Sequence, residues 1–245
     1  MNRYFVNPNQ VEDDVIRIIR KDDIHHIKTV MRMRAGDAIE ISDGVTWEYD
    51  GVLAAQDGEG LKVEIVGRRL FAREPKVRIT LFQGIPKQGK MDFIIQKAVE
   101  MGVSEVVPVF MARTVVADKG NFSKKLTRYE MIAEEAAAQS GRGIVPFVRH
   151  PMSFDKTIET LHDFDLVLFL YENEDQTTIK KVLRSLEQVP KNVALIVGPE
   201  GGFAPEEAQS LRAMGTQCVT MGRTILRTET AGLAALAMCM YELEL

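Results

Sequence analysis

The sequence predicts an α/β protein, in which a mainly parallel sheet covered by helices on both faces follows a small β-barrel. Two observations carry this prediction. Up to residue 73, short strands surround one helical segment, whereas beyond Pro75 apolar strands alternate regularly with helices, as in βαβ units. The 245 residues are enough for two modest domains. We therefore predict a barrel over residues 1–73 and an α/β domain over residues 74–245, divided within "LFAREPK".

The first domain is predicted from alternating apolar residues and turn signals. "DDIHHIKTVMRM" instead has apolar residues at helical spacing behind an aspartate cap, which predicts a helix over residues 22–33. "RAGD", "DG" and "DGEG" mark turns between strands. The expected strands are "RYFV", "VIRI", "AIEISD", "TWEYDGVLAAQ" and "LKVEIVGRRLF".

The second domain is predicted from strand and helix patterns in alternation. The expected strands are "VRITLFQG", "VSEVVPVF", "VPFVRH", "DLVLFLYE", "NVALIVG" and "QCVTMG". The expected helices are "KMDFIIQKAVEMG", "KKLTRYEMIAEEAAAQS", "SFDKTIETLHDF", "TTIKKVLRSLE", "PEEAQSLRAMG" and a last helix from about Thr228.

Composition restricts the class of protein. The hydrophobic fraction is 45% and the charged fraction 27%, no apolar run is long enough to cross a bilayer, and the N-terminus lacks the pattern of a secretory signal. We therefore expect a soluble, cytoplasmic protein. Cys218 and Cys239 have no paired spacing and are expected to be buried, reduced thiols. A net charge of −4 argues against a wholly basic surface, so any RNA-binding surface must be a local patch.

A glycine-rich turn, "GPEGGF", follows the buried strand "NVALIV". Ligands bind at the carboxyl ends of strands in open α/β sheets, and glycines there allow close backbone approach. A purely structural turn is the alternative. The turn comes late in the domain, whereas a dinucleotide fingerprint follows the first strand of its unit, so NAD is disfavoured.

A second loop, "MGRTILRTETA", leads into the last helix. Thr228 or Thr230 could cap that helix, and Glu229 suits its positive end. Together with "GPEGGF" and the end of "LVLFLYE", this loop is expected to enclose a flat, partly apolar ligand.

The order of "RYFV", "HHIKTVMRMRAGD", "KMDFIIQKAVEMGV", "AQSGR", "GPEGGF" and "MGRTILRTETA" closely resembles the RsmE family of ribosomal RNA methyltransferases, within the SPOUT superfamily. The resemblance covers essentially the whole chain. It implies a PUA-like barrel, a SPOUT-type α/β domain with a C-terminal trefoil knot, and a homodimer. It also implies S-adenosylmethionine as methyl donor and N3 of a uridine in 16S ribosomal RNA, in the small ribosomal subunit, as acceptor. The chain departs from the family pattern in two places: Ala138 stands where the family often has Glu, and "ART" (residues 112–114) stands where the family often has "ERS".

The resemblance leads to candidate site residues. The adenine is expected against Leu170, Ile225 and Leu226. Expected to approach the cofactor with their backbone are Gly198, Gly201, Gly202, Met221 and Gly222. N3 of uracil must lose a proton before it can attack, and the catalytic candidates are Glu200 and Glu229, with Arg227 or Arg142 to hold the uracil oxygens or a phosphate. Glu229 has a competing role at the helix start, and Glu200 a competing role in holding the loops together.

Local clusters of basic residues are expected to bind RNA phosphates, although a solvated surface explains any single one. The predicted RNA-binding residues are Arg32, Arg34, Arg68, Arg69, Lys87, Lys90 and Arg142, with Arg73, Lys124, Lys125 and Arg128 as further candidates. His25 and His26 lack the company of other ligands, so no metal is expected.

The last helix is apolar nearly all round, which predicts burial on two sides and hence a dimer interface. A single buried core helix is the alternative. Two rival functions stay open at this point: a non-catalytic RNA-binding or ribosome-assembly module, and a nucleotide-cofactor oxidoreductase.

Overall fold

The computed structural model describes residues 3–54, 60–71, 74–87, 89–115 and 122–244. Its internal contacts divide the chain into two units. Unit 1 comprises residues 1–74 and 137–145, and unit 2 comprises residues 75–136 and 146–245. The sequence assigned residues 137–145 to the second domain, but their contacts group them with the first.

Unit 1 is built on a six-stranded sheet with the order β1-β4-β5-β6-β3-β2. β1 runs parallel to β4, and the other neighbours are antiparallel. Its strands are β1 (Arg3–Phe5), β2 (Val11–Glu12), β3 (Val15–Ile18), β4 (Ala38–Ser42), β5 (Trp47–Leu53) and β6 (Leu61–Leu70). Ile16, Ile41 and Val63 are fully buried at the centre of its apolar core.

The helical segment of unit 1 differs from the predicted regular helix. After η1 (Pro8–Gln10) and the strands β2 and β3, α1 (Lys21–His25) continues into a π-helical turn, η2 (His26–Val30). A π turn contains more residues than an α turn, so the 3.6-residue spacing no longer holds. Ile27 stays buried, whereas Val30 and Met31 are 58% and 39% exposed.

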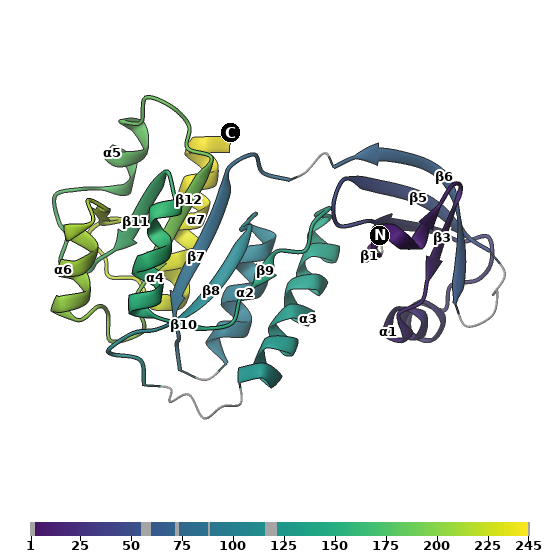
Figure 1. Ribbon diagram of the computed structural model, residues 1–245, viewed down its shortest axis with the longest axis horizontal. Helices are drawn as coiled ribbons and strands as arrows, with labels where there is room; N and C mark the ends of the chain where they lie inside the picture. Colours follow the sequence, from purple (N-terminus) through teal and green to yellow (C-terminus); the bar gives the residue numbers. More distant parts are fainter. Residues whose placement is uncertain (1–2, 55–59, 72–73, 88, 116–121, 245) are drawn as a thin grey trace. The chain divides into compact units, whose positions relative to one another are not determined.

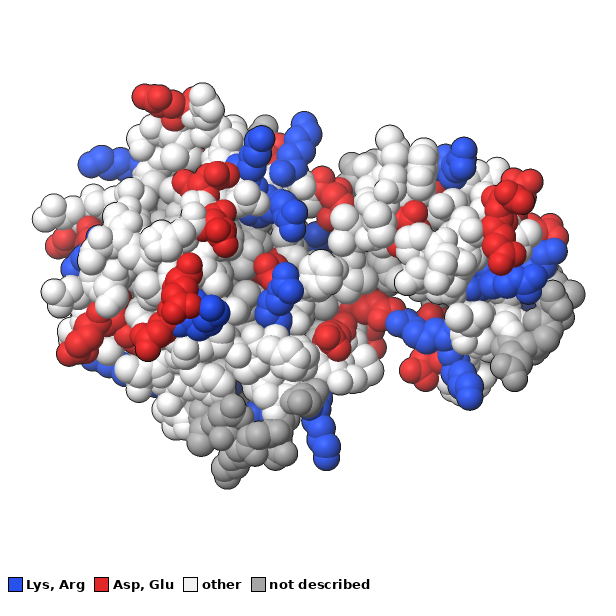
Figure 2. Space-filling view, in the orientation of Figure 1, with Lys and Arg blue, Asp and Glu red and all other residues white. Residues whose placement is uncertain are grey.

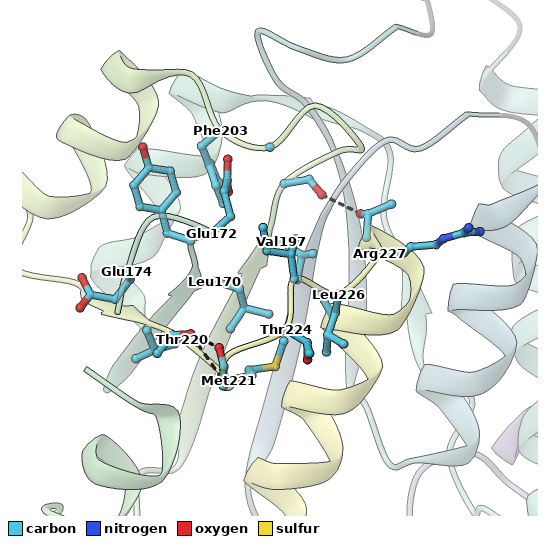
Figure 3. A pocket seen from close by; sticks show the side chains of 18 of the residues that line it. Leu170, Glu172, Glu174, Val197, Phe203, Thr220, Met221, Thr224, Leu226 and Arg227 are labelled. Atoms are coloured by element: carbon cyan, nitrogen blue, oxygen red, sulfur yellow. Dashed lines mark hydrogen bonds between the residues drawn. The ribbon is translucent and has the colours of Figure 1, made fainter. Parts of the chain in front are cut away.

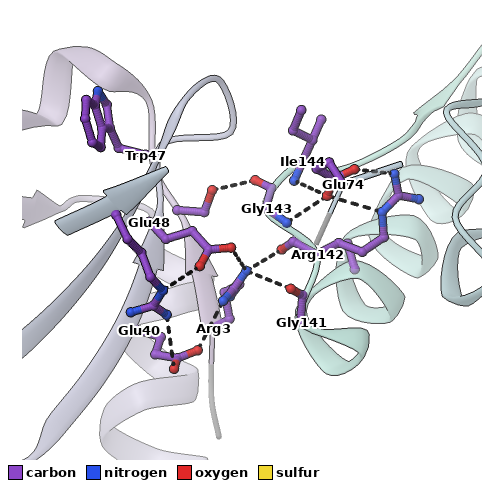
Figure 4. Close-up of polar contacts among 12 residues, drawn as sticks. Arg3, Glu40, Trp47, Glu48, Glu74, Gly141, Arg142, Gly143 and Ile144 are labelled. Carbon is purple, nitrogen blue, oxygen red and sulfur yellow. Dashed lines mark hydrogen bonds and ion pairs between the residues drawn. The ribbon is translucent and has the colours of Figure 1, made fainter. Parts of the chain in front are cut away.

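Residues 137–145 are held in unit 1 by buried polar contacts (Figure 4). Arg3 Nη1 donates to Glu48 Oε1 at 2.8 Å and to the carbonyl oxygens of Gly141 and Arg142 at 2.9 and 2.8 Å. The Glu74 carboxylate accepts from the Arg142 side chain at 2.7 Å and from the Gly143 N–H at 2.8 Å. These partners are far apart in sequence, which is why no local pattern predicted the grouping.

Unit 2 contains a seven-stranded sheet in which every pairing is parallel, as predicted. The strand order is β10-β8-β7-β12-β11-β13, and β9 pairs separately with β8. The strands are β7 (Arg78–Gly84), β8 (Glu105–Phe110), β9 (Phe147–Val148), β10 (Met152–Ser153), β11 (Leu166–Leu170), β12 (Asn192–Val197) and β13 (Gln217–Val219). The single strand predicted at residues 145–150 is thus only two residues long, and a second short strand follows it.

Helices cover both faces of this sheet, and Figure 1 shows α4 and α7 on opposite sides of it. α7 packs against α2, α5, β7 and β12, whereas apolar residues of α4, η3 and α6 share a core with the alternate side chains of β7, β8, β11 and β12. The helices of the described chain from β7 onward are α2 (Lys90–Glu100), α3 (Phe122–Ser140), α4 (Phe154–Thr160), η3 (Leu161–Asp163), α5 (Ile179–Arg184), α6 (Pro205–Ala213) and α7 (Thr228–Glu244). The α/β fold class is confirmed, and this topology is compatible with the trefoil knot that the resemblance implies.

Replacing Arg3 by Met tests the buried contacts of unit 1. The Glu48 carboxylate, 3% exposed, would keep only the partly exposed Arg69 as a cation, and the carbonyls of Gly141 and Arg142 would lose their donor. The expected cost is about 3 kcal/mol of unfolding free energy for unit 1. Chemical denaturation followed by Trp47 fluorescence measures this, because the chain has one tryptophan and it lies in unit 1. The control is Arg17→Met, which removes an exposed pair with Glu12 and should change stability by less than about 1 kcal/mol. Equal losses of unfolding free energy in the two variants would contradict the stabilising role of the buried Arg3 contacts.

Candidate functional site

A pocket of about 800 Å³ lies at the carboxyl ends of β11, β12 and β13 (Figure 3). Three loops line it: residues 170–178 after β11, residues 197–203 after β12, and residues 219–228 between β13 and α7. These are the loops that the sequence suggested would meet. The size suits a small-molecule ligand rather than a structural void.

The glycines of the loop after β12 permit a backbone path closed to other residues. Gly202 has φ +68°, and a Cβ built on it would lie 2.3 Å from Glu172 Oε1. A Cβ on Gly198 would lie 3.1 Å from the backbone carbon of Gly202. The loop therefore folds back on itself against the loop after β11, and side chains at these positions would force the two apart.

Buried hydrogen bonds of the Thr228 side chain join three segments of the chain next to the pocket. The Thr228 hydroxyl donates to the Gly198 carbonyl at 2.6 Å and accepts from Gln83 Nε2 at 2.8 Å. Gly84, next along β7, has no room for a Cβ, which would lie 2.5 Å from Pro199 N. Sequence reasoning assigned Thr228 only a capping role and missed Gln83, although a glutamine within the apolar strand "ITLFQG" was a usable signal.

The two candidate catalytic carboxylates share one cation. Lys90 Nζ lies 3.1 Å from Glu200 Oε1 and 2.9 Å from Glu229 Oε2. Hydrogen bonds to Glu229 and then to Glu200 raise the pKa of Lys90. Lys90 was predicted to bind RNA phosphate, but its charge is already matched by these carboxylates.

Both carboxylates are held in the ionised form. Burial raises the pKa of Glu200, but its own backbone N–H, the Lys87 N–H and Lys90 outweigh this and lower the pKa overall. Burial likewise raises the pKa of Glu229, and the Lys90 hydrogen bond leads the contributions that lower it below its ordinary value. Glu229 is therefore an ionised group in the first turn of α7 and also part of an ion pair.

The apolar residues predicted to contact the adenine lie partly in the wall of the pocket and partly at its rim. Leu170 is buried in the pocket wall, and Leu226 and Met221 lie near it in Figure 3. Ile225 is 81% exposed and stands at the rim. Arg227 lines the opening, but its side chain extends away from Leu170 in Figure 3.

Acidic side chains of the loop after β11 also line the pocket, which the sequence analysis missed: Glu172, Glu174 and Asp175. The N–H of Thr177 is the largest influence on Glu174 and lowers its pKa, with a further contribution from the Gln176 N–H. This side of the pocket is therefore suited to a ligand with positive charge.

The segment that departs from the family pattern, residues 112–114, contacts the glycine loop. Arg113 Nη1 donates to the Gly201 carbonyl at 2.8 Å, and a Cβ on Gly201 would meet Arg113 Cβ at 3.0 Å. The Ala112 N–H donates to Glu207 Oε1 at 2.8 Å. A carboxylate from α6 thus binds this segment, and Arg113 supports the loop after β12.

The predicted RNA-binding residues lie in different environments. Arg142 is buried in unit 1 against Glu74, so the structure indicates a stabilising role in place of phosphate contact. Arg69 pairs with Glu48 and Asp50. Four of the predicted residues are exposed: Arg32, Arg34, Arg68 and Lys87. The further candidates on α3 are exposed as well, namely Lys124, Lys125 and Arg128. Arg128 pairs with Asp92. Arg73 lies outside the described residues. Figure 2 shows basic and acidic side chains interspersed on the face in view, as the mild net charge suggests.

Three further sequence features have a structural account. His26 Nδ1 is hydrogen-bonded to the Tyr4 hydroxyl at 2.8 Å, and no group of metal-ligating side chains occurs among the described residues. Cys239 is buried and Cys218 partly buried, both as free thiols. Within the described part of the chain, no helix has the length and apolar character needed to cross a membrane.

Replacing Lys90 by Met tests the shared cation. Without the ammonium group, the pKa values of Glu200 and Glu229 should both rise relative to the unmodified chain, as measured by ¹³C NMR titration of glutamate carboxyls. Carboxyls with a lowered pKa stabilise the fold above their unfolded-state pKa and lose that contribution as pH falls to their folded-state pKa. The variant should therefore have a smaller contribution to lose, and the loss should be complete at a higher pH. Lys97→Met, which removes an exposed pair with Glu100 on the same helix, should leave both values unchanged.

Comparisons with known proteins agree with this architecture. A profile of the RNA methyltransferase domain matches residues 73–240, and one of the RNA methyltransferase PUA domain matches residues 19–66. Ribosomal RNA small subunit methyltransferase E of Bacillus subtilis is 34% identical over 100% of this chain and 98% of its own.

Two solved structures are also similar. The ribosomal RNA small subunit methyltransferase E of Neisseria gonorrhoeae, bound to S-adenosylmethionine, has TM-score 0.85 and 30% identity over 98% of this chain and 97% of its own. A protein assigned as a methyltransferase in Legionella pneumophila, in complex with S-adenosylmethionine, has TM-score 0.86 and 28% identity over 98% of this chain and 96% of its own. The fold, the position of the pocket and these matches together confirm the resemblance: this chain belongs to the ribosomal RNA small subunit methyltransferase E family of RNA methyltransferases.

Proposed function

We propose that this chain transfers a methyl group from S-adenosylmethionine to N3 of a uridine in the 16S ribosomal RNA of the small ribosomal subunit. The observation that carries the proposal is the pocket at the ends of β11, β12 and β13, in a chain whose relatives are named for small-subunit ribosomal RNA. The name of the family supports the RNA, and the resemblance supports the uridine N3 position.

The pocket fits the proposed cofactor in shape and charge. Gly198 and Gly202 let the loop after β12 pack closely against itself and against the loop after β11, and Leu170 and Leu226 offer apolar surface to a flat base. The loop after β11 adds carboxylates suited to a cationic donor. Bound here, S-adenosylmethionine supplies a methyl group activated by its sulfonium charge. We assign Gly201, Met221, Gly222 and Ile225 to the same binding loops.

The acceptor requires a group that removes the N3 proton or stabilises the anion that forms when this proton leaves. Glu200 and Glu229 are ionised at neutral pH and therefore able to accept a proton, although a lowered pKa makes each a weak base. We propose that one of them acts in this role, with Arg227 at the opening to hold an RNA oxygen. Substituting Gln at each position and following methyl transfer against pH distinguishes them, because loss of a base is partly relieved at high pH.

We propose that unit 1 binds RNA and unit 2 binds the cofactor. We further propose a homodimer in the cytoplasm that buries α7 on a second side, since Met238 and Tyr241 of this helix are 38% and 67% exposed in the single chain. Light scattering that returned the mass of one chain would remove the dimer from the proposal.

The two rival functions are set aside. A non-catalytic RNA-binding module does not require a pocket of this kind, and the relatives are named as methyltransferases. An oxidoreductase would require a dinucleotide fingerprint after the first strand of unit 2, and β7 is followed by "IPK" in its place.

Replacing Gly202 by Val is expected to abolish S-adenosylmethionine binding in titration calorimetry. The new side chain would meet Glu172 and strain a backbone with φ +68°. Gly215→Val is the matched control, because Gly215 has φ +75° but lies outside the pocket with no atom near its would-be Cβ. It should carry similar strain and retain binding, with circular dichroism confirming that both variants fold. Unchanged affinity at Gly202 would contradict the placement of the cofactor.

Mass spectrometry of 16S ribosomal RNA tests the reaction. Cells lacking this chain should lack one 3-methyluridine, and the purified chain with S-adenosylmethionine should restore it to small subunits isolated from those cells. A full set of methyluridines in the deletion strain, or a methyl group restored at another atom, would refute the proposed acceptor.

A further inference from the structure

Two neighbouring arginines of unit 1 have opposite environments. Arg69 lies 2.9 Å from Glu48 and 2.6 Å from Asp50, so its charge is matched by carboxylates. Arg68 has no ion pair within the described residues; its guanidinium lies over the Trp47 ring, 5.1 Å from the centroid. Successive residues of a strand point to opposite faces, which explains why adjacent arginines differ so completely.

The register of β5 and β6 gathers aromatic, apolar and cationic groups on the face of Arg68. Trp47 pairs with Leu70, and Tyr49 pairs with Arg68. Tyr49 is buried, Trp47 is half-buried, and Leu70 is 59% exposed. The outer part of this face therefore presents an indole, a guanidinium and an exposed leucine beside the core of the sheet.

The backbone that leads into Trp47 is held by Asp43. Asp43 Oδ1 accepts hydrogen bonds from the backbone N–H groups of Val45, Thr46 and Trp47 at 2.9, 2.7 and 2.9 Å. This fixes the turn between β4 and β5 and so fixes the start of β5. In Figure 4, Trp47 stands apart from the polar contacts of Arg3, with no interaction drawn to it.

We propose that Trp47, Arg68 and Leu70 form a platform that binds an unpaired base of the substrate RNA, with the Arg68 charge matched by a neighbouring phosphate. Proteins bind single-stranded RNA by stacking bases on aromatic rings and guanidinium planes beside positive charge. Charge complementarity favours RNA over an uncharged partner, because Arg68 is a cation on an otherwise apolar platform. This inference rests on the proposed function for the nature of its ligand and adds a binding site to it.

The single tryptophan makes the platform directly measurable. A fluorescein-labelled oligouridylate should bind the full-length chain by anisotropy, and the unlabelled oligouridylate should quench Trp47 fluorescence over the same concentration range. Pairing the strand with oligoadenylate should weaken both signals, because paired bases cannot stack on the ring.

Substitutions separate the platform from general electrostatic attraction. By anisotropy, Trp47→Ala and Arg68→Ala should each weaken oligouridylate binding by about 5- to 150-fold. Two controls should change it far less: Arg69→Ala, on the opposite face, and Arg149→Ala, whose guanidinium lies over Phe147 but is paired with Glu105. Circular dichroism and S-adenosylmethionine calorimetry on each variant show that both units stay folded.

Three outcomes would overturn the platform: no oligouridylate binding, binding that leaves Trp47 fluorescence unchanged, or equal losses in the Arg68 and Arg149 variants. Methyl transfer by the unmodified chain is measured separately. Methyl transfer together with unchanged Trp47 fluorescence would refute the platform alone. Quenching of Trp47 fluorescence without methyl transfer would refute the proposed function alone.

Discussion

The hydrogen bonds of Thr228 determine how the pocket is assembled. Its buried hydroxyl bonds to both Gly198 and Gln83, so the start of α7, the glycine loop and the end of β7 are fixed together. An unpaired polar group at this depth would cost free energy, which makes the arrangement difficult to loosen at one contact alone. Because Glu229 follows Thr228 directly, the hydrogen bonds of Thr228 also bring the Glu229 carboxylate within reach of Lys90.

Charge is distributed unevenly around the pocket. On one side, Lys90 matches the charges of Glu200 and Glu229 and keeps both ionised. On the other side, the carboxylates of the loop after β11 line the pocket, and Glu174 accepts hydrogen bonds from the N–H groups of Gln176 and Thr177 and lies 3.6 Å from Arg212. The two sides of the pocket therefore offer different electrostatic surroundings to a bound ligand.

Unit 1 uses arginine for two separate purposes. Arg3 and Arg142 are buried and matched by carboxylates and carbonyls, so they stabilise the junction between the sheet and residues 137–145. Arg68 lies on an aromatic ring with its charge unmatched among the described residues. A count of basic residues in the sequence cannot separate these roles, because the partners that neutralise an arginine are set by strand pairing.

The sequence by itself determined the strand and helix order, the parallel α/β class and the three loops of the pocket, because strand periodicity, helix periodicity and glycine placement are local properties. Leu170, Gly198 and Leu226, which the sequence assigned to one site, all line the pocket. Only the tertiary structure decided what the polar side chains do. Gln83 meets Thr228, Lys90 meets Glu229, and Arg142 is buried against Glu74, each across a separation of 68 to 145 residues along the chain. Such contacts depend on how the strands are ordered in the sheet, and no repeat or spacing along the chain records that order.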